Sequence, residues 1–514
     1  MQLYDNRFQQ DQYSFLPFAT TTAGLISNPF SAQKDYYITK YPDEGYSSYS
    51  ISRNTSTSSR FATATFAPGK SQVGQNRASV LSKRTNAANE VRIWDLDASG
   101  LPVATGYYAA NELFGNESES PTDAQQAYTT KAPKSRIYTD KEGRVILKMV
   151  ADSNYTYQNS SVTTWQSTYY VYDELGRLCY TLPPKAVALT GSNTGLTSAV
   201  LNDLCFQYRY DLKGRPCAIR KPGEDGFTWI VYDRKNRAIM RQTPQEAAAH
   251  QWEIGFFDIQ DRIKATSLFT DNNAYSQSQW QQQVDTWSGS STSNLLYHLT
   301  TEIGESTVPG ENQITGNTMM NYTWYDNYSS SDPTGGFWST YANTLQLSGD
   351  LLSTTGAETP VRSLRTQGMV TGTKTRILPS PHADPSKTGD WKQSAVFYDD
   401  KGHIIYSVSY DNYQGNMIHA SYAGSQYDFA GRVLITKHIF TNTKSTDATN
   451  QHTEWNKNTY DAISGVLVKS LHKVDNGLWV PLSTYTYDDM GQVQREVLGN
   501  SGEVRDYRYN IRGS

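Results

Sequence analysis

The chain has 514 residues, a formal net charge of -4 and 37% hydrophobic residues, with Lys+Arg 46 and Asp+Glu 50. Disordered chains are poor in aromatics and strongly charged, whereas this chain is 12% aromatic and nearly neutral, so we expect a folded protein. The balanced charge gives no electrostatic footprint for nucleic acid or an anionic membrane surface. No apolar run approaches the ~18 residues of a membrane helix, and the first residues lack the regions of a secretory signal. The apolar content favours thin β-layers over one thick core.

The N-terminal region, residues 1–135, carries few clear motifs. It contains strand patterns such as residues 90–95, where apolar and polar side chains alternate. We therefore expect an N-terminal β region with degenerate repeats.

Beyond this region, the phrase Tyr-Asp-x-x-Gly-Arg recurs along the chain in two blocks, residues 136–265 and residues 391–514. The full copies contain Tyr172, Asp173, Gly176 and Arg177; Tyr210, Asp211, Gly214 and Arg215; and Tyr427, Asp428, Gly431 and Arg432. Weaker copies contain Tyr232, Asp233 and Arg237, with Asn236 in place of glycine; Tyr398, Asp399 and Gly402; and Tyr487, Asp488 and Gly491. Variants also occur at Asp140 and Asp258. The intervals are typical of repeat architectures, which have periods of about 20–50 residues.

Each copy has the pattern of a β-hairpin. Aromatic and β-branched residues alternate before it, Asp accepts hydrogen bonds from turn N–H groups, and Gly supplies the positive φ that ends the turn. A single hairpin is only marginally stable in water, so neighbouring hairpins must stack. The arginine has two possible partners, an Asp or a Tyr of the adjacent hairpin. The motif residues are thus predicted to be structural, in an all-β array of antiparallel hairpins.

Residues 266–390, between the two blocks, are dominated by Ser, Thr, Asn, Gln and Gly. We expect an irregular segment docked on the hairpins, with a short helix over residues 278–287.

No motif indicates catalysis. Residues 368–375 miss the glycine spacing of a phosphate-binding loop, and the eight histidines lack metal-ligand spacing. The repeated aspartates share one environment, which favours turn formation over a catalytic carboxylate pair. Cys179, Cys205 and Cys217 are interpreted as small buried hydrophobes, with one disulfide as the alternative. We expect no enzyme activity, no cofactor and no metal site.

The repeated phrase resembles the signature of the YD-repeat, or RHS (rearrangement hotspot), family. Residues 67–77, 141–148, 182–186, 365–375 and 509–513 also look like linking segments of its bacterial, polymorphic-toxin-type members. The resemblance runs from about residue 60 to the end. It implies hairpins that spiral into a curved, partly closed hollow shell around a C-terminal effector, in a secreted or cell-surface bacterial protein. Because repeats still run at Ser514, we expect an N-terminal or middle fragment of a longer polypeptide.

Two functions are consistent with these observations. The first is a non-catalytic wall segment of such a shell, whose partners are the rest of the shell and an effector domain absent from this chain. The alternative is an extracellular adhesin-like module that binds glycans or a protein partner, because the chain is rich in Tyr and Trp beside Asp and Asn. Neither involves nucleic acid or membrane insertion.

Overall fold

The structure is a computed structural model of the chain, and its parts form two compact units. One unit is Met1–Trp229 with Arg508–Ser514, and the other is Ile230–Tyr507. The boundary falls inside strand β15. The structure describes residues 2–4, 11–20, 24–57, 60–120, 134–151, 165–190, 196–301, 309, 313–328, 351–353, 356–377, 391–413, 416–442, 450–500 and 502–513.

The strands of the first unit pair antiparallel in a ladder, each with its neighbour, from β1 to β5 and from β8 to β15. Strands β6 and β7 form a separate two-stranded sheet. The strands are β1 (Gln2–Tyr4), β2 (Asp11–Phe15), β3 (Tyr49–Thr57), β4 (Arg60–Phe66), β5 (Ser79–Thr85), β6 (Arg92–Leu96), β7 (Pro102–Tyr107), β8 (Phe114–Glu119), β9 (Lys134–Thr139), β10 (Val145–Ala151), β11 (Trp165–Tyr172), β12 (Leu178–Leu182), β13 (Phe206–Tyr210), β14 (Pro216–Arg220) and β15 (Thr228–Tyr232). The helices are α1 (Pro29–Lys40), α2 (Pro184–Ala188) and α3 (Ser198–Leu204), with the 3₁₀ turns η1 (Pro42–Glu44) and η2 (Val73–Gln75).

The second unit continues the same plan, with consecutive antiparallel pairing from β16 to β29. Its strands are β16 (Ala238–Gln242), β17 (Gln251–Phe257), β18 (Ile263–Thr270), β19 (Asn317–Asp326), β20 (Thr366–Arg376), β21 (Trp391–Tyr398), β22 (Ile404–Tyr413), β23 (Asn416–Tyr427), β24 (Val433–Asn442), β25 (Gln451–Tyr460), β26 (Leu467–Val474), β27 (Val480–Tyr487), β28 (Val493–Leu498) and β29 (Glu503–Asp506). Its helices are α4 (Pro244–Ala248), α5 (Gln277–Thr286) and α6 (Leu295–Thr300). The prediction of an all-β array of antiparallel hairpins is confirmed.

The core of the first unit lies where other elements cover one face of the ladder. On β11, Tyr169 and Val171 are buried at alternate positions, as the pleat of a strand requires. Val91 and Trp94, beside and within the β6–β7 hairpin, and Leu201 of α3 pack into the same cluster. A thin layer therefore gains a core because inserted elements cover it.

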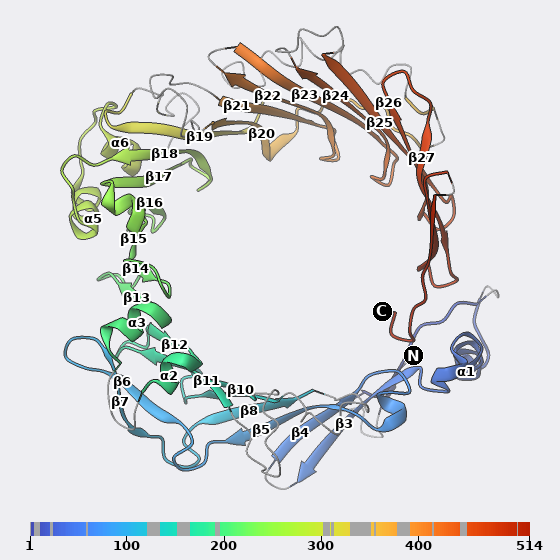
Figure 1. Cartoon of the computed structure of the whole chain (residues 1–514), viewed down its shortest axis with the longest axis horizontal. Helices are drawn as coiled ribbons and strands as arrows, with labels where there is room; N and C mark the ends of the chain where they lie inside the picture. The colour runs from blue at the N-terminus through green and yellow to red at the C-terminus, as the bar shows by residue number, and fades with distance from the viewer. Residues whose placement is uncertain are drawn as a thin grey trace. The chain divides into compact units, whose positions relative to one another are not determined.

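The helix predicted over residues 278–287 is present as α5. Ser276 and Gln279 form a capping box at its start, and Trp280 and Val284, one turn apart, face inward. Gln281 fixes the helix to strand β15 through two hydrogen bonds, one from Tyr232 N–H to its Oε1 at 2.9 Å and one from its Nε2 to the Tyr232 carbonyl at 2.8 Å. Figure 1 shows α5 and α6 beside β16–β18.

The segment 266–390 also contributes two strands, β19 and β20, which pair with each other and continue the ladder. Its described part is therefore more regular than its composition suggests. The strand is hard to recognise from sequence because its buried residues, Asn317, Met319 and Tyr322, do not alternate regularly with exposed ones. The serine-rich stretch at 329–336 and the tryptophan at 338 lie outside the described residues.

Candidate functional site

The turn of residues 172–177 is organised by the side chain of one aspartate. Asp173 Oδ1 accepts a hydrogen bond from the backbone N–H of Arg177 at 2.8 Å, and Oδ2 accepts one from Arg177 Nε at 2.7 Å. Gly176 N–H donates to the Asp173 carbonyl at 2.9 Å. Gly176 has φ of 76°, a left-handed conformation that side chains disfavour. The result is a type I turn followed by a left-handed residue, a common hairpin connection, which also fixes the guanidinium in place.

The other motif residues lie in turns of the same kind. The Arg Nε to Asp Oδ2 bond recurs in Asp140–Arg144 (2.6 Å), Asp211–Arg215 (2.7 Å), Asp233–Arg237 (2.6 Å), Asp258–Arg262 (2.8 Å) and Asp428–Arg432 (2.7 Å). Positive φ recurs at Gly214, Gly402, Gly431, Gly491 and Asn236. His403 takes the arginine position in the turn after Tyr398, with Nδ1 2.9 Å from Asp399 Oδ2. In the turn after Tyr487, the backbone N–H of Gln492 donates to Asp488 Oδ1 at 2.9 Å.

Successive turns are connected by a contact that we call the joint. The Arg177 guanidinium lies over the ring of Tyr210, 4.9 Å from its centroid, and the Tyr210 hydroxyl donates to the Leu178 carbonyl at 2.8 Å. Joints with both contacts occur between Arg144 and Tyr172, Arg262 and Tyr325, and Arg432 and Tyr460. The ring of His403 stacks on Tyr427 at 4.7 Å, and the Tyr427 hydroxyl donates to the Ile404 carbonyl.

The joint explains why the motif needs both Tyr and Arg. One guanidinium pairs with its own aspartate through Nε and presents its face to the tyrosine of the next hairpin. The two partners that the sequence left open are therefore used together. A cation over an aromatic ring is worth about 0.5–1 kcal/mol at an exposed site, so the array gains stability from many small, identical contacts.

Asp173, Asp211 and Asp428 are held in their charged form. Burial raises the pKa of Asp173, Asp211 and Asp428. Hydrogen bonds from the backbone and side chain of the following arginine lower it more, so that each pKa lies below the ordinary range. These carboxylates serve as permanent acceptors in the turns.

One further copy is recognisable at Tyr325 and Asp326, at the end of β19. Asp326 accepts from Arg262 Nη1 at 2.8 Å and Nη2 at 2.5 Å, and also from the backbone N–H of Gly368 at 2.7 Å. The hydrogen bonds from Arg262 lower the pKa of Asp326, although its burial opposes this. The copy has lost its own Gly-Arg pair, and its aspartate binds the arginine of the preceding turn instead.

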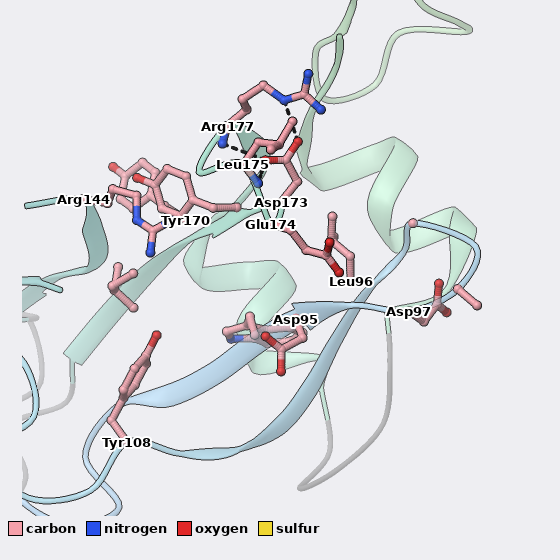
Figure 2. A pocket seen from close by; sticks show the side chains of 15 residues that line it. Asp95, Leu96, Asp97, Tyr108, Arg144, Tyr170, Asp173, Glu174, Leu175 and Arg177 are labelled. Carbon is pink, nitrogen blue, oxygen red and sulfur yellow. Dashed lines mark hydrogen bonds and ion pairs between the residues drawn. The ribbon is translucent and has the colours of Figure 1, made fainter. Parts of the chain in front are cut away.

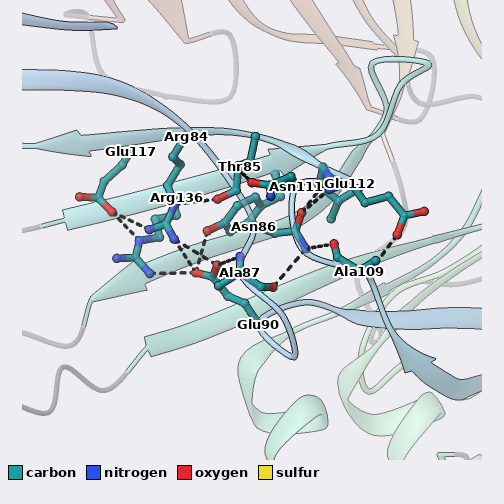
Figure 3. A network of polar contacts seen from close by, with 12 residues as sticks. Arg84, Thr85, Asn86, Ala87, Glu90, Ala109, Asn111, Glu112, Glu117 and Arg136 are labelled. Atoms are coloured by element: carbon teal, nitrogen blue, oxygen red, sulfur yellow. Dashed lines mark hydrogen bonds and ion pairs between the residues drawn. The ribbon is translucent and has the colours of Figure 1, made fainter. Parts of the chain in front are cut away.

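A polar network across β5, β8 and β9 has no counterpart in the motif (Figure 3). Glu90 accepts from Arg84 Nη2 and Arg136 Nη1, each at 3.1 Å, and from the Tyr138 hydroxyl at 2.7 Å. Glu117 accepts from both arginines. Burial, and then the bond to Glu90, raises the pKa of Tyr138. The charges compensate one another, and the network ties the three strands together.

A pocket of about 790 Å³ lies in the first unit between the β6–β7 hairpin and two of the motif turns (Figure 2). We call it the β6–β7 pocket. Trp94, Asp95 and Asp97 line it from the hairpin, and Tyr170 and Glu174 line it from β11 and its turn. The Tyr180 hydroxyl holds the hairpin by donating to the Gly100 carbonyl at 2.9 Å. The volume is in the range of small-ligand sites. No sequence pattern indicated this pocket, because its walls come from segments about 80 residues apart.

The remaining sequence patterns fall in ordinary structure. Residues 368–375 lie within strand β20, not in a loop that opens a helix, as a phosphate-binding loop would. Cys179, Cys205 and Cys217 are free thiols, and burial raises the pKa of Cys205 to about 12. Within the described ranges, no three His, Cys, Asp or Glu side chains are grouped closely enough to hold a metal ion. No helix among those residues combines the length and apolar character needed to cross a membrane.

Comparisons with known proteins give similarity at the level of structure only. No protein-family profile matches the chain, and no curated protein matches it. Twenty-three chains of solved structures match. One is the crystal structure of TcdB2-TccC3, with 12% identity and a TM-score of 0.44, covering 90% of this chain and 21% of that chain. This chain thus spans about a fifth of the length of the chain it matches.

Proposed function

We propose that this chain is a non-catalytic wall segment of an RHS-type β-shell, which helps to enclose a downstream effector in a secreted or cell-surface protein. The observation that supports this most directly is the joint. It recurs in both units with the same two contacts, at Arg177–Tyr210 in one and Arg432–Tyr460 in the other. Identical joints let hairpins be added one after another, which is the requirement for a continuous wall.

The hydrogen bonds and ring contacts of the charged motif residues support a structural role. Their carboxylates accept from turn N–H groups and from arginine, and the arginines face tyrosine rings. A general acid or base needs an accessible group with a pKa near the working pH. The pKa of Asp173, Asp211 and Asp428 is moved below the ordinary range instead.

Limited proteolysis of the full-length product of the source gene tests the proposal. We expect a protease-resistant fragment derived from sequence downstream of residue 514. Arg432→Ala, which removes a joint, should increase cleavage of that fragment. Arg241→Ala, an exposed arginine outside the joints that pairs with Glu253, should not. If no downstream fragment is protected, the chain does not enclose an effector.

A further inference from the structure

We propose that the β6–β7 pocket binds a basic peptide, through the ammonium or guanidinium groups of its lysine or arginine side chains. The pocket lies within the first unit, so this inference is independent of the wall role. This inference places a peptide-binding function at the β6–β7 pocket.

The pocket has an excess of negative charge. Asp95, Asp97 and Glu174 line it with exposed side chains. Asp95 accepts from the Thr105 hydroxyl and Asp97 from two backbone N–H groups, which are all neutral donors. Glu174 has no hydrogen-bond or ion-pair partner among the described residues. Figure 2 shows Asp95 and Asp97 on the hairpin and Glu174 on the turn of β11.

The arginines that border the pocket do not neutralise these three carboxylates. Arg144 is bonded to Asp140, and Arg177 to Asp173, through the ion pairs of their own turns. Each cation is therefore balanced by a motif aspartate. The three remaining carboxylates attract a cation from solvent.

Aromatic side chains supply a second component of recognition. Trp94, Tyr108 and Tyr170 line the pocket, and rings of this kind attract ammonium and guanidinium groups over their faces. Trp94 is 8% exposed, and its indole N–H is buried without an acceptor among the described residues. The methylene stems of lysine and arginine side chains can pack on such rings while their charged ends reach the carboxylates.

The distribution of the carboxylates favours an extended ligand. They are not grouped closely enough to hold a metal ion, since no such group of three occurs among the described residues. Carboxylates spread around a half-open pocket suit a ligand that carries several positive charges along its length.

Isothermal titration of the full chain with tetralysine amide tests the proposal, with Nε-acetylated tetralysine as the uncharged control peptide. We expect saturable binding of the charged peptide only, weakened about tenfold or more by Asp95→Asn combined with Glu174→Gln. Asp203→Asn removes an exposed carboxylate of α3, outside the pocket, and should change binding less than about twofold. The double variant keeps the fold because neither side chain holds a charged partner, and a thermal melt verifies this.

Three results would overturn the proposal. The first is no binding of tetralysine, or binding that the double variant leaves unchanged. The second is an equal loss with Asp203→Asn, which would indicate general surface charge. The third is equal binding of spermine, or binding of chitotetraose without tetralysine, which would assign the pocket to a polyamine or a sugar.

Discussion

Gly176 holds the left-handed position of its turn, where any side chain is strained. Its φ is 76°, and an added Cβ would lie 3.1 Å from Arg144 Nη1. We expect Gly176→Val to destabilise the first unit by about 1–3 kcal/mol, because a β-branched residue is disfavoured there. Urea denaturation followed by circular dichroism measures this. Gly106→Val in strand β7 is the matched control, since its Cβ meets nothing within 4 Å. Equal losses in both variants would contradict the turn assignment.

The motif aspartates make stability depend on pH in acid. The pKa of Asp428 in the folded protein lies below that of the unfolded chain, about 3.9. The charged form therefore contributes stability that is complete above about pH 5 and is lost as the pH falls through the folded pKa. We expect the contribution of Asp428 to the melting temperature to be constant from pH 8 to 5 and to be lost below pH 4.

Asp428→Asn isolates this contribution. We expect it to cost about 1–2 kcal/mol at pH 7, because a charge-assisted hydrogen bond is lost. We also expect a smaller drop in melting temperature on acidification than in the wild type. Asp203→Asn, an exposed aspartate of α3, should leave both unchanged. A variant with the same acid midpoint and slope as the wild type would show that Asp428 does not titrate with unfolding.

These residue-scale features were accessible from sequence because the interactions are local. Asp173 and Arg177 are four residues apart, so their turn follows from residue type and spacing. For the joint, the sequence indicated the two kinds of partner that the arginine could have, but not that it contacts both. Arg177 and Tyr210 are 33 residues apart, and spacing could not show that one guanidinium contacts both Asp173 and the next tyrosine.

Elements inserted between repeats escaped sequence reasoning. The β6–β7 hairpin covers β11 through contacts such as the one from Arg92 N–H to the Tyr169 hydroxyl, 77 residues away. Glu90 and Arg136 are separated by 46 residues. No local pattern encodes such pairs, and the network and the β6–β7 pocket both depend on them.

The segment after β29 behaves as an element of the first unit, to which residues Arg508–Ser514 belong. Ile511 is 6% exposed, and its side chain would lie 3.2 Å from a Cβ added to Gly69. Asn510 forms the turn by accepting from Arg512 N–H at 2.9 Å.

Ile511→Asp should release this segment, because it places a charge in an apolar contact at a cost of about 2–4 kcal/mol. We expect faster hydrogen exchange at residues 508–513 and little change in the melting temperature of the remainder. Val504→Asp in β29, at a position already 44% exposed, is the control and should not affect that exchange. Unchanged exchange in Ile511→Asp would show that other contacts hold the segment.

The fold of the whole molecule could be predicted from sequence only for the parts of the chain that carry the repeated motif. Because each hairpin contacts its neighbours, a run of motifs predicts a ladder, and both units have one. The sequence does not place the division inside β15, since the motif continues on both sides of it. That division depends on contacts between distant segments, including the return of residues 508–514 to the first unit.

The proposed wall role has a consequence for the dimensions of the isolated chain. A compact, filled globule of 514 residues has a radius of gyration of about 24 Å. Hairpins arranged as one curved layer place their mass farther from the centre, so we expect a clearly larger value by small-angle X-ray scattering. Arg177→Ala with Arg432→Ala removes one joint in each unit and should broaden the distance distribution, whereas Arg241→Ala should not. A radius near 24 Å would mean that the ladders fold back into a filled body, which leaves no room for an enclosed effector.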